Sequence, residues 1–158
     1  MRRLAGALVV AAVAAVALVL ASGGGPGTLG PKLLVHAARR GDVAILRGLL
    51  FLGADAAATS PETSPILAAA WAGHVEVVEL LIARGAGVDA ADGSGVTPLM
   101  AAATQGHDEV VRLLVRHKAS LTAMIRCGNA LDIALANHRE STAAILRAAG
   151  AVPSRKPQ

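Results

Sequence analysis

The sequence predicts an all-α fold, an α-solenoid of stacked helix-turn-helix units joined by short hairpin-like turns. One segment, from Ser64 to Ala86, returns with nearly the same pattern 33 residues later, from Thr97 to Ala119. Apolar residues make up 54% of the 158-residue chain but aromatic residues only 1%. The core must therefore be built from many close contacts between small aliphatic side chains, and short stacked helices provide such contacts.

The first 21 residues are typical of a signal peptide or a membrane anchor. Arg2 and Arg3 precede an uncharged apolar run from Leu4 to Ala21. The run ends in small side chains, which suits cleavage after Ala21, but it is also long enough to span a bilayer, for which about 20 apolar residues are needed. Both alternatives stay open, and both carry the rest of the chain across the membrane. We expect an exported protein, periplasmic or secreted, or a membrane-anchored one with its repeat domain on the non-cytoplasmic side.

Residues 22–31, SGGGPGTLGP, are predicted to form a flexible linker because glycine and proline dominate them. The repeat domain is expected over residues 32–152, divided at about 32–57, 58–90, 91–122 and 123–152. Residues 153–158 are predicted to form a disordered tail.

Three markers recur in one register through the repeat domain, with a period of 32 or 33 residues. The first marker ends the first helix of each unit and consists of Gly41, Gly73, Gly106 and His138. The second ends the second helix and consists of Gly53-Ala54, Gly85-Ala86, Lys118-Ala119 and Gly150-Ala151. The third begins a first helix and consists of Ser64-Pro65, Thr97-Pro98 and Asn129-Ala130. The shared period predicts structural repeats.

Each repeat is predicted to hold two helices. Thr97 can cap a helix start, and Pro98 suits the first helical position, where no backbone N–H is needed. Alanines then let neighbouring helices approach closely, and Gly106 can end the helix in the left-handed conformation. The second helix places one apolar face toward a neighbour: Val110, Val111, Leu114 and Val115. Because a single unit cannot bury that face, the units must stack.

These motifs resemble the ankyrin repeat. The segment TPLMAAATQGH matches the family pattern TPLHxAAxxGH, and DAADGSGVTPL matches the turn that precedes it. The resemblance covers about residues 32–152 as four repeats, with close matches in the second and third and degraded ones at both ends. It implies a curved stack whose concave surface is built from the turn tips and the outer faces of the first helices.

The last repeat carries polar residues at positions that are apolar elsewhere. Thr142 and Arg147 replace the valine or isoleucine of the earlier repeats. A terminal repeat has no further neighbour to cover it, so we expect both residues on a polar outer face.

The resemblance also implies that partner-binding residues are those that vary between repeats on the concave side. At the turns they are Pro61, Glu62, Gly93, Ser94, Val96 and Arg126. At the ends of the first helices they are Arg39, Arg40, Trp71, Ala72, Thr104, Gln105 and Asn137. Trp71 is the one tryptophan of the chain. It is either an exposed hot spot for binding or a packing residue over the alanines of the next repeat.

The remaining chemistry-bearing residues favour structural roles. His74 and His107 occupy one position in successive repeats, which favours a hydrogen bond that holds the turn over catalysis or metal binding. Asp108 and Glu109 begin a helix, where carboxylates are stabilised by the helix dipole. Cys127 is the one cysteine, so no intramolecular disulfide forms, and the sequence places no base that would activate it.

We therefore expect a non-enzymatic protein–protein interaction module, without cofactor or metal, that binds a protein partner as a monomer. The alternative is an accessory or inhibitor protein dedicated to one exported enzyme or toxin. Nucleic acid is not an expected partner, because Arg2 and Arg3 supply half of the net charge of +4 and aromatic stacking platforms are absent from the sequence. Contact with a membrane is expected only through the N-terminal segment.

Overall fold

The computed structural model describes residues 30–58 and 63–154. The predicted signal or anchor segment, most of the linker and the end of the tail lie outside the described residues, as do Pro61 and Glu62. Among the helices of the described ranges, none is long and apolar enough to cross a bilayer.

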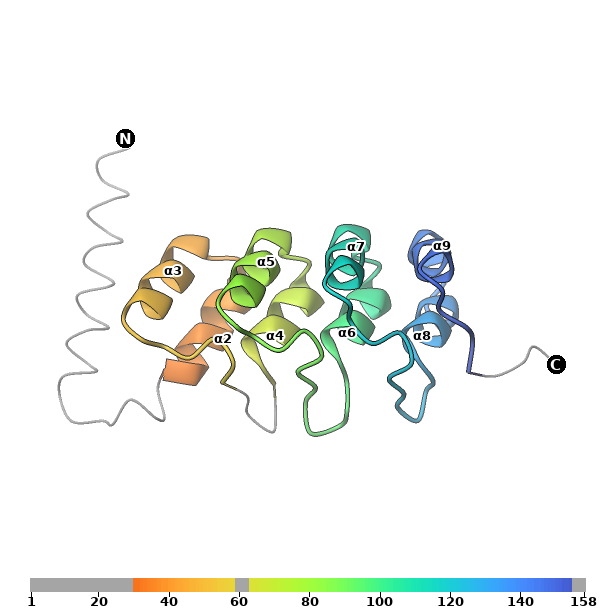
Figure 1. The fold of residues 1–158 in the computed structure, drawn as a ribbon, viewed down its shortest axis with the longest axis horizontal. Coiled ribbons are helices and arrows are strands. Elements are labelled where there is room, and N and C mark those ends of the chain that lie inside the picture. Colours follow the sequence, from red (N-terminus) through yellow and green to blue (C-terminus); the bar gives the residue numbers. More distant parts are fainter. Residues whose placement is uncertain (1–29, 59–62, 155–158) are drawn as a thin grey trace.

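The described residues form eight helices and no strand, which confirms the all-α prediction. The helices follow one another in pairs: α2 (Gly30–Arg40) and α3 (Val43–Phe51), α4 (Pro65–Ala72) and α5 (Val75–Ala83), α6 (Pro98–Gln105) and α7 (Asp108–Arg116), α8 (Ala130–Ala136) and α9 (Glu140–Ala148). The pairs stand in a row (Figure 1). We call α2, α4, α6 and α8 the A layer, and α3, α5, α7 and α9 the B layer.

Local signals begin and end the A-layer helices as the sequence predicts. The hydroxyl oxygens of Ser64 and Thr97 accept hydrogen bonds of 3.3 Å from the backbone N–H of Leu67 and Met100, respectively. Each of these caps is followed by proline at the first helical position. Gly73 and Gly106 end α4 and α6 in the left-handed conformation, with φ near +80° at both.

The core is shared between neighbouring pairs. Within the A layer α2 packs on α4, α4 on α6 and α6 on α8, while in the B layer α5 packs on α7 and α7 on α9. Six alanines of α4 and α6 lie fully or almost fully buried between their neighbours: Ala68, Ala69, Ala70, Ala101, Ala102 and Ala103. Because alanine adds so little bulk, the helices approach closely enough to exclude water. Each pair thus contributes buried apolar side chains to the core that it shares with the next pair, as the repeat implies.

Thr142 corrects one expectation about the terminal repeat. Arg147 is exposed, as predicted for an outer face, but Thr142 is only 1% exposed. Its hydroxyl donates a hydrogen bond to Asp108 at the start of α7. The prediction for Thr142 was wrong because this position faces inward, toward the preceding pair, where a polar residue is tolerated only with a hydrogen-bond partner.

Candidate partner-binding surface

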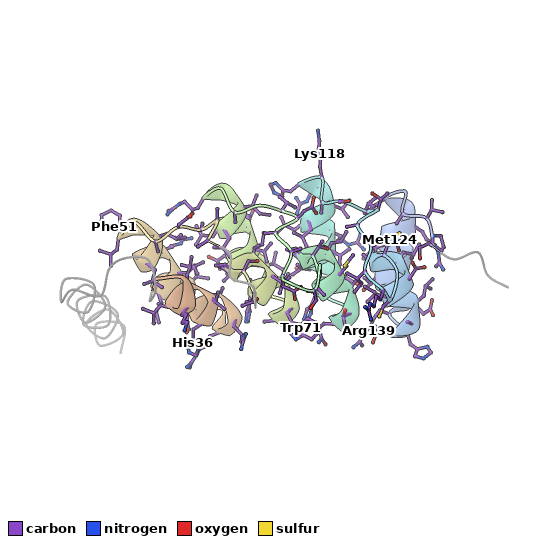
Figure 2. The ribbon with its side chains drawn as sticks, turned by 90° about the horizontal axis from the view of Figure 1, so that it is seen from below. His36, Phe51, Trp71, Lys118, Met124 and Arg139 are labelled. Atoms are coloured by element: carbon purple, nitrogen blue, oxygen red, sulfur yellow. The ribbon has the colours of Figure 1, made fainter. Side chains whose placement is uncertain are left out.

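The A-layer helices all end along one edge of the stack, which brings together most of the predicted site residues. At this edge lie the ends of α2 (Arg39, Arg40), α4 (Trp71, Ala72) and α6 (Thr104, Gln105) and the C-cap of α8 (Asn137). Figure 2 shows Trp71 and Arg139 on this edge, and Phe51 and Lys118 on the opposite one. We call the edge at which the A-layer helices end the A edge.

Side chains of the following repeat hold the A edge in place. The Nε2 atom of His74 lies 3.1 Å from the carbonyl oxygen of Arg39, and Nε2 of His107 lies 3.0 Å from that of Trp71. A carbonyl oxygen only accepts, so each Nε2 must carry the proton and donate it. Arg139 takes the same part in the last repeat, where its Nε donates to the carbonyl oxygen of Thr104 at 3.3 Å. The ends of α2, α4 and α6 are therefore each held by a side chain of the following repeat.

Two polar side chains of the A edge are already engaged within their own helices. The hydroxyl of Thr104 donates to the carbonyl oxygen of Met100 at 2.8 Å, and Nδ2 of Asn137 donates to that of Ile133 at the same distance. Gln105 is half-buried, and its side chain forms no such bond with any described residue. Gln105 is therefore the better placed of the three to donate to a partner.

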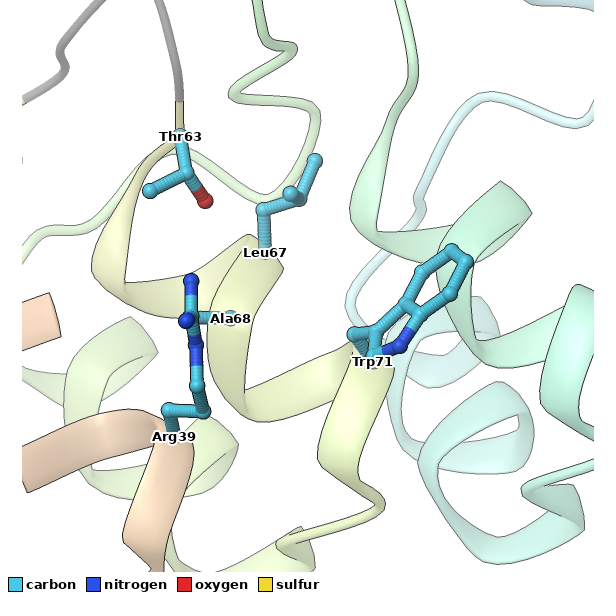
Figure 3. A pocket seen from close by; sticks show the side chains of 5 residues that line it. All are labelled: Arg39, Thr63, Leu67, Ala68 and Trp71. Atoms are coloured by element: carbon cyan, nitrogen blue, oxygen red, sulfur yellow. The ribbon is translucent and has the colours of Figure 1, made fainter. Parts of the chain in front are cut away.

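A groove opens where α2 and α4 meet at the A edge. It is an open depression of about 390 Å³, lined by Arg39, Thr63, Leu67, Ala68 and Trp71. Figure 3 shows Arg39 and Trp71 on either side of Leu67 and Ala68. Trp71 is 47% exposed, so its ring is partly packed and partly presented to solvent. The structure thus joins Arg39 and Trp71, two predicted site residues from different repeats, in one concave feature.

The charge of the groove is positive. The helix α2 carries Lys32, Arg39 and Arg40 and no acidic residue, while α4 carries no charged residue. The Nε atom of Arg40 lies 3.5 Å from a carboxylate oxygen of Asp42. Among the described residues, no carboxylate forms an ion pair with Arg39. Of the residues that line the groove, Arg39 is the charged one.

The turns between the pairs are held by aspartates. Oδ1 of Asp92 accepts hydrogen bonds from the backbone N–H of Ser94 at 2.8 Å and Val96 at 3.0 Å. Oδ1 of Asp89 accepts one from Ser120 at 2.9 Å, which joins two successive turns. Of the predicted turn residues, Gly93, Ser94 and Arg126 are exposed, whereas Val96 is half-buried against the core. Val96 is the one described member of this set that packs inward.

A second set of inter-repeat contacts surrounds Asp108 in the B layer. Its carboxylate accepts hydrogen bonds from the hydroxyls of Ser141 and Thr142. Partial burial acts to raise the pKa of Asp108, but these two hydrogen bonds and the charge of Arg112 outweigh it, so its pKa lies below the usual value. The ionised form of Asp108 is therefore the one that stabilises the contact between α7 and α9.

Two of the histidines form contacts between repeats, and Cys127 lies at the surface. The rings of His74 and His107 use one nitrogen each in holding the A edge. Cys127 is exposed in the turn that precedes α8, where Ile125 and Gly128 pair as an isolated bridge. Within residues 30–58 and 63–154, no three side chains of His, Cys, Asp or Glu lie close enough together to hold a metal ion.

Sequence reasoning missed the floor of the groove. Leu67 and Ala68 stand four and three positions before Trp71, so the helical period alone places them on its face of α4. The helical period was therefore enough to predict Leu67 and Ala68. The position of Arg39 beside them depends on how α2 packs on α4, which the sequence does not show.

The comparison with protein families agrees with the repeat. Residues 34–125, and again residues 66–156, match the family model described as Ankyrin repeats (3 copies). The two overlapping matches cover well over half of the chain. No curated protein matches the chain.

Proposed function

Because the chain belongs to the ankyrin repeat family, whose repeats are protein–protein interaction modules, we propose that it binds its protein partner through the A edge and the adjoining turns. We further propose that all four helix pairs of residues 32–152 are ankyrin repeats. The single observation that carries it is the groove in which Trp71 is half exposed beside Arg39. Aromatic and arginine side chains dominate binding energy at protein interfaces.

Preorganisation supports the same surface. The ends of α2, α4 and α6 are held by His74, His107 and Arg139 from the following repeats. A surface that is ordered before binding loses less conformational entropy when a partner docks. Among the described residues, the ends of the B-layer helices show no such row of side chains bonded across repeats.

Export is part of the proposal and rests on the N-terminal sequence. A positive start followed by an apolar run from Leu4 to Ala21 is typical of a signal peptide or an anchor. Mass spectrometry of the protein from fractionated cells of its native host tests this. A mature chain beginning at Ser22 outside the cytoplasm supports cleavage, an intact chain in the membrane fraction supports anchoring, and an intact cytoplasmic chain contradicts both.

A site-specific photocrosslinking experiment tests the binding surface. A photoreactive phenylalanine analogue replaces Gln105 on the A edge or, as the matched control, Lys118 on the opposite edge. We expect a crosslinked partner from Gln105 in native-host extract, and its loss when Trp71→Ala is added to the Gln105 variant. Thermal melting followed by circular dichroism checks that Trp71→Ala still folds. Crosslinking from Lys118 alone, or a yield that Trp71→Ala does not change, contradicts the proposed surface.

The oligomeric state is open to direct measurement. We propose that the protein acts as a monomer, and light scattering coupled to gel filtration tests this. A mass of twice the chain at micromolar concentration contradicts it.

A further inference from the structure

The groove between α2 and α4 has an apolar floor and one cationic wall. Leu67 and Ala68 form the floor and are 7% and 4% exposed, so little of them remains for water to contact. The Trp71 ring forms the wall on the α6 side, and Arg39 stands on the α2 side (Figure 3). A volume of about 390 Å³ suits one or two side chains of a bound peptide.

The charges around this groove are complementary to an anion. Arg39 has no carboxylate partner among the described residues, and Lys32 and Arg40 share its helix. Neither α4 nor α6 contributes a charged residue. A cationic ligand would be repelled here, whereas a carboxylate would gain a charge-assisted hydrogen bond from the exposed guanidinium of Arg39.

We propose that this groove takes an acidic peptide segment of the partner, with an aliphatic side chain on Leu67 and Trp71 and a neighbouring carboxylate on Arg39. The inference rests on the proposed function and adds the chemical class of the segment that is bound. The apolar surface of the groove and the charge of Arg39 act together in binding such a segment. Burial of the half-exposed Trp71 ring provides affinity, and Arg39 provides the discrimination between acidic and neutral sequences.

Nucleic acid would also bring negative charge, but the site is ill suited to it. Phosphate recognition draws its affinity from several cations spaced along the backbone. Here a single arginine lines the groove, without an ion pair to any described residue, and it borders an apolar surface. A single-stranded oligothymidine therefore serves as the competing probe in the test.

The fluorescence of Trp71 can report binding to the groove directly. The chain has one tryptophan and no tyrosine, so tryptophan emission comes from this groove alone. The probe is the acetylated and amidated peptide Gly-Glu-Leu-Glu-Gly. Its controls replace both glutamates with glutamine, both glutamates with lysine, or leucine with glycine.

We expect Gly-Glu-Leu-Glu-Gly to shift the emission of Trp71 and the three control peptides to bind at least about tenfold more weakly. Arg39→Gln should weaken binding of the acidic peptide about tenfold, the loss implied by one charge-assisted hydrogen bond. The matched control is Arg84→Gln, an exposed arginine at the end of α5 on the opposite edge, which should leave the titration unchanged. Raising the salt concentration should weaken the wild-type interaction toward that of Arg39→Gln.

Several results would overturn the inference. They are equal affinity for the glutamine peptide, equal affinity in Arg39→Gln, no emission change with millimolar acidic peptide, or tighter binding of oligothymidine. The photocrosslinking described above separates this failure from failure of the proposed function. If the peptides fail while Gln105 still crosslinks its partner, and Arg39→Gln leaves that yield intact, the surface stands and the acidic segment is wrong.

Discussion

The imidazole ring of His107 lies over Gly73, so close that a Cβ atom added to this glycine would come within 2.7 Å of the ring. The same relationship holds between His74 and Gly41, again at 2.7 Å. In the last repeat the side chain of Arg139 takes the place of histidine, and a Cβ on Gly106 would meet its Cδ at 2.8 Å. The glycine that ends an A-layer helix is thus matched in shape to the residue that opens the B-layer helix of the following repeat.

Gly73→Ala should therefore cost more stability than an alanine at another left-handed glycine. Gly85 has φ +89° with nothing within 4 Å of an added Cβ, so Gly85→Ala should cost only the left-handed backbone strain, about 1 kcal/mol. Gly73→Ala adds the displacement of His107 and should cost about 2 kcal/mol or more. Urea unfolding measures both free energies, and equal losses would show that the His107 ring does not constrain this position.

His107→Ala should lower the free energy of unfolding by about 1 kcal/mol, since it removes a hydrogen bond to the Trp71 carbonyl oxygen between two repeats. The control is His117→Ala, an exposed residue after α7, which should change stability by less than about 0.5 kcal/mol. Both are measured by urea unfolding. Similar losses in the two variants would mean that the bond to Trp71 contributes nothing specific.

His138→Gly should stabilise the protein. His138 ends the last A-layer helix with φ +56°, a left-handed conformation that costs a residue with a side chain about 1 kcal/mol more than glycine. Asn137→Gly is the matched control, because its φ of −96° gives glycine no such advantage. The midpoint of thermal unfolding should rise in the first variant and fall or stay constant in the second. A lower midpoint for His138→Gly would refute the argument.

The stability conferred by Asp108 should depend on pH. Its pKa in the folded state lies below the value of about 3.9 expected for an unfolded aspartate. Its contribution is therefore fully present above about pH 4 and is lost as the pH falls through the folded-state pKa.

Asp108→Asn removes this dependence, and the gap in stability between wild type and variant should narrow as the pH falls from 7 toward about 2. Glu109→Gln, at the exposed neighbouring position, should show a smaller change. Unfolding by urea at a series of pH values measures the gap. A gap that is constant over this range would mean that the hydrogen bonds from Ser141 and Thr142 do not select the ionised carboxylate.

The sequence alone determined the helices, their order and their stacking. Ser64 and Thr97 cap a helix by bonding to a backbone N–H three residues away, and Gly73 and Gly106 end one through their own dihedral angles. These are local effects that a short stretch of chain specifies. The period of the repeat then implied that each apolar face is buried by the next unit, without any knowledge of the exact packing.

Only the tertiary structure decided which residues meet across repeats. The bond of His107 to Trp71, the bond of Thr142 to Asp108, and the groove shared by Arg39 and Trp71 each join residues about one repeat apart in the chain. Thr142 was misplaced for this reason, since a polar residue in an apolar register is compatible both with an outer face and with a buried partner. The distance and the rotation between neighbouring helix pairs determine which side chains make such contacts. Both quantities depend on how many side chains pack together at the same time, so a short stretch of sequence does not specify them.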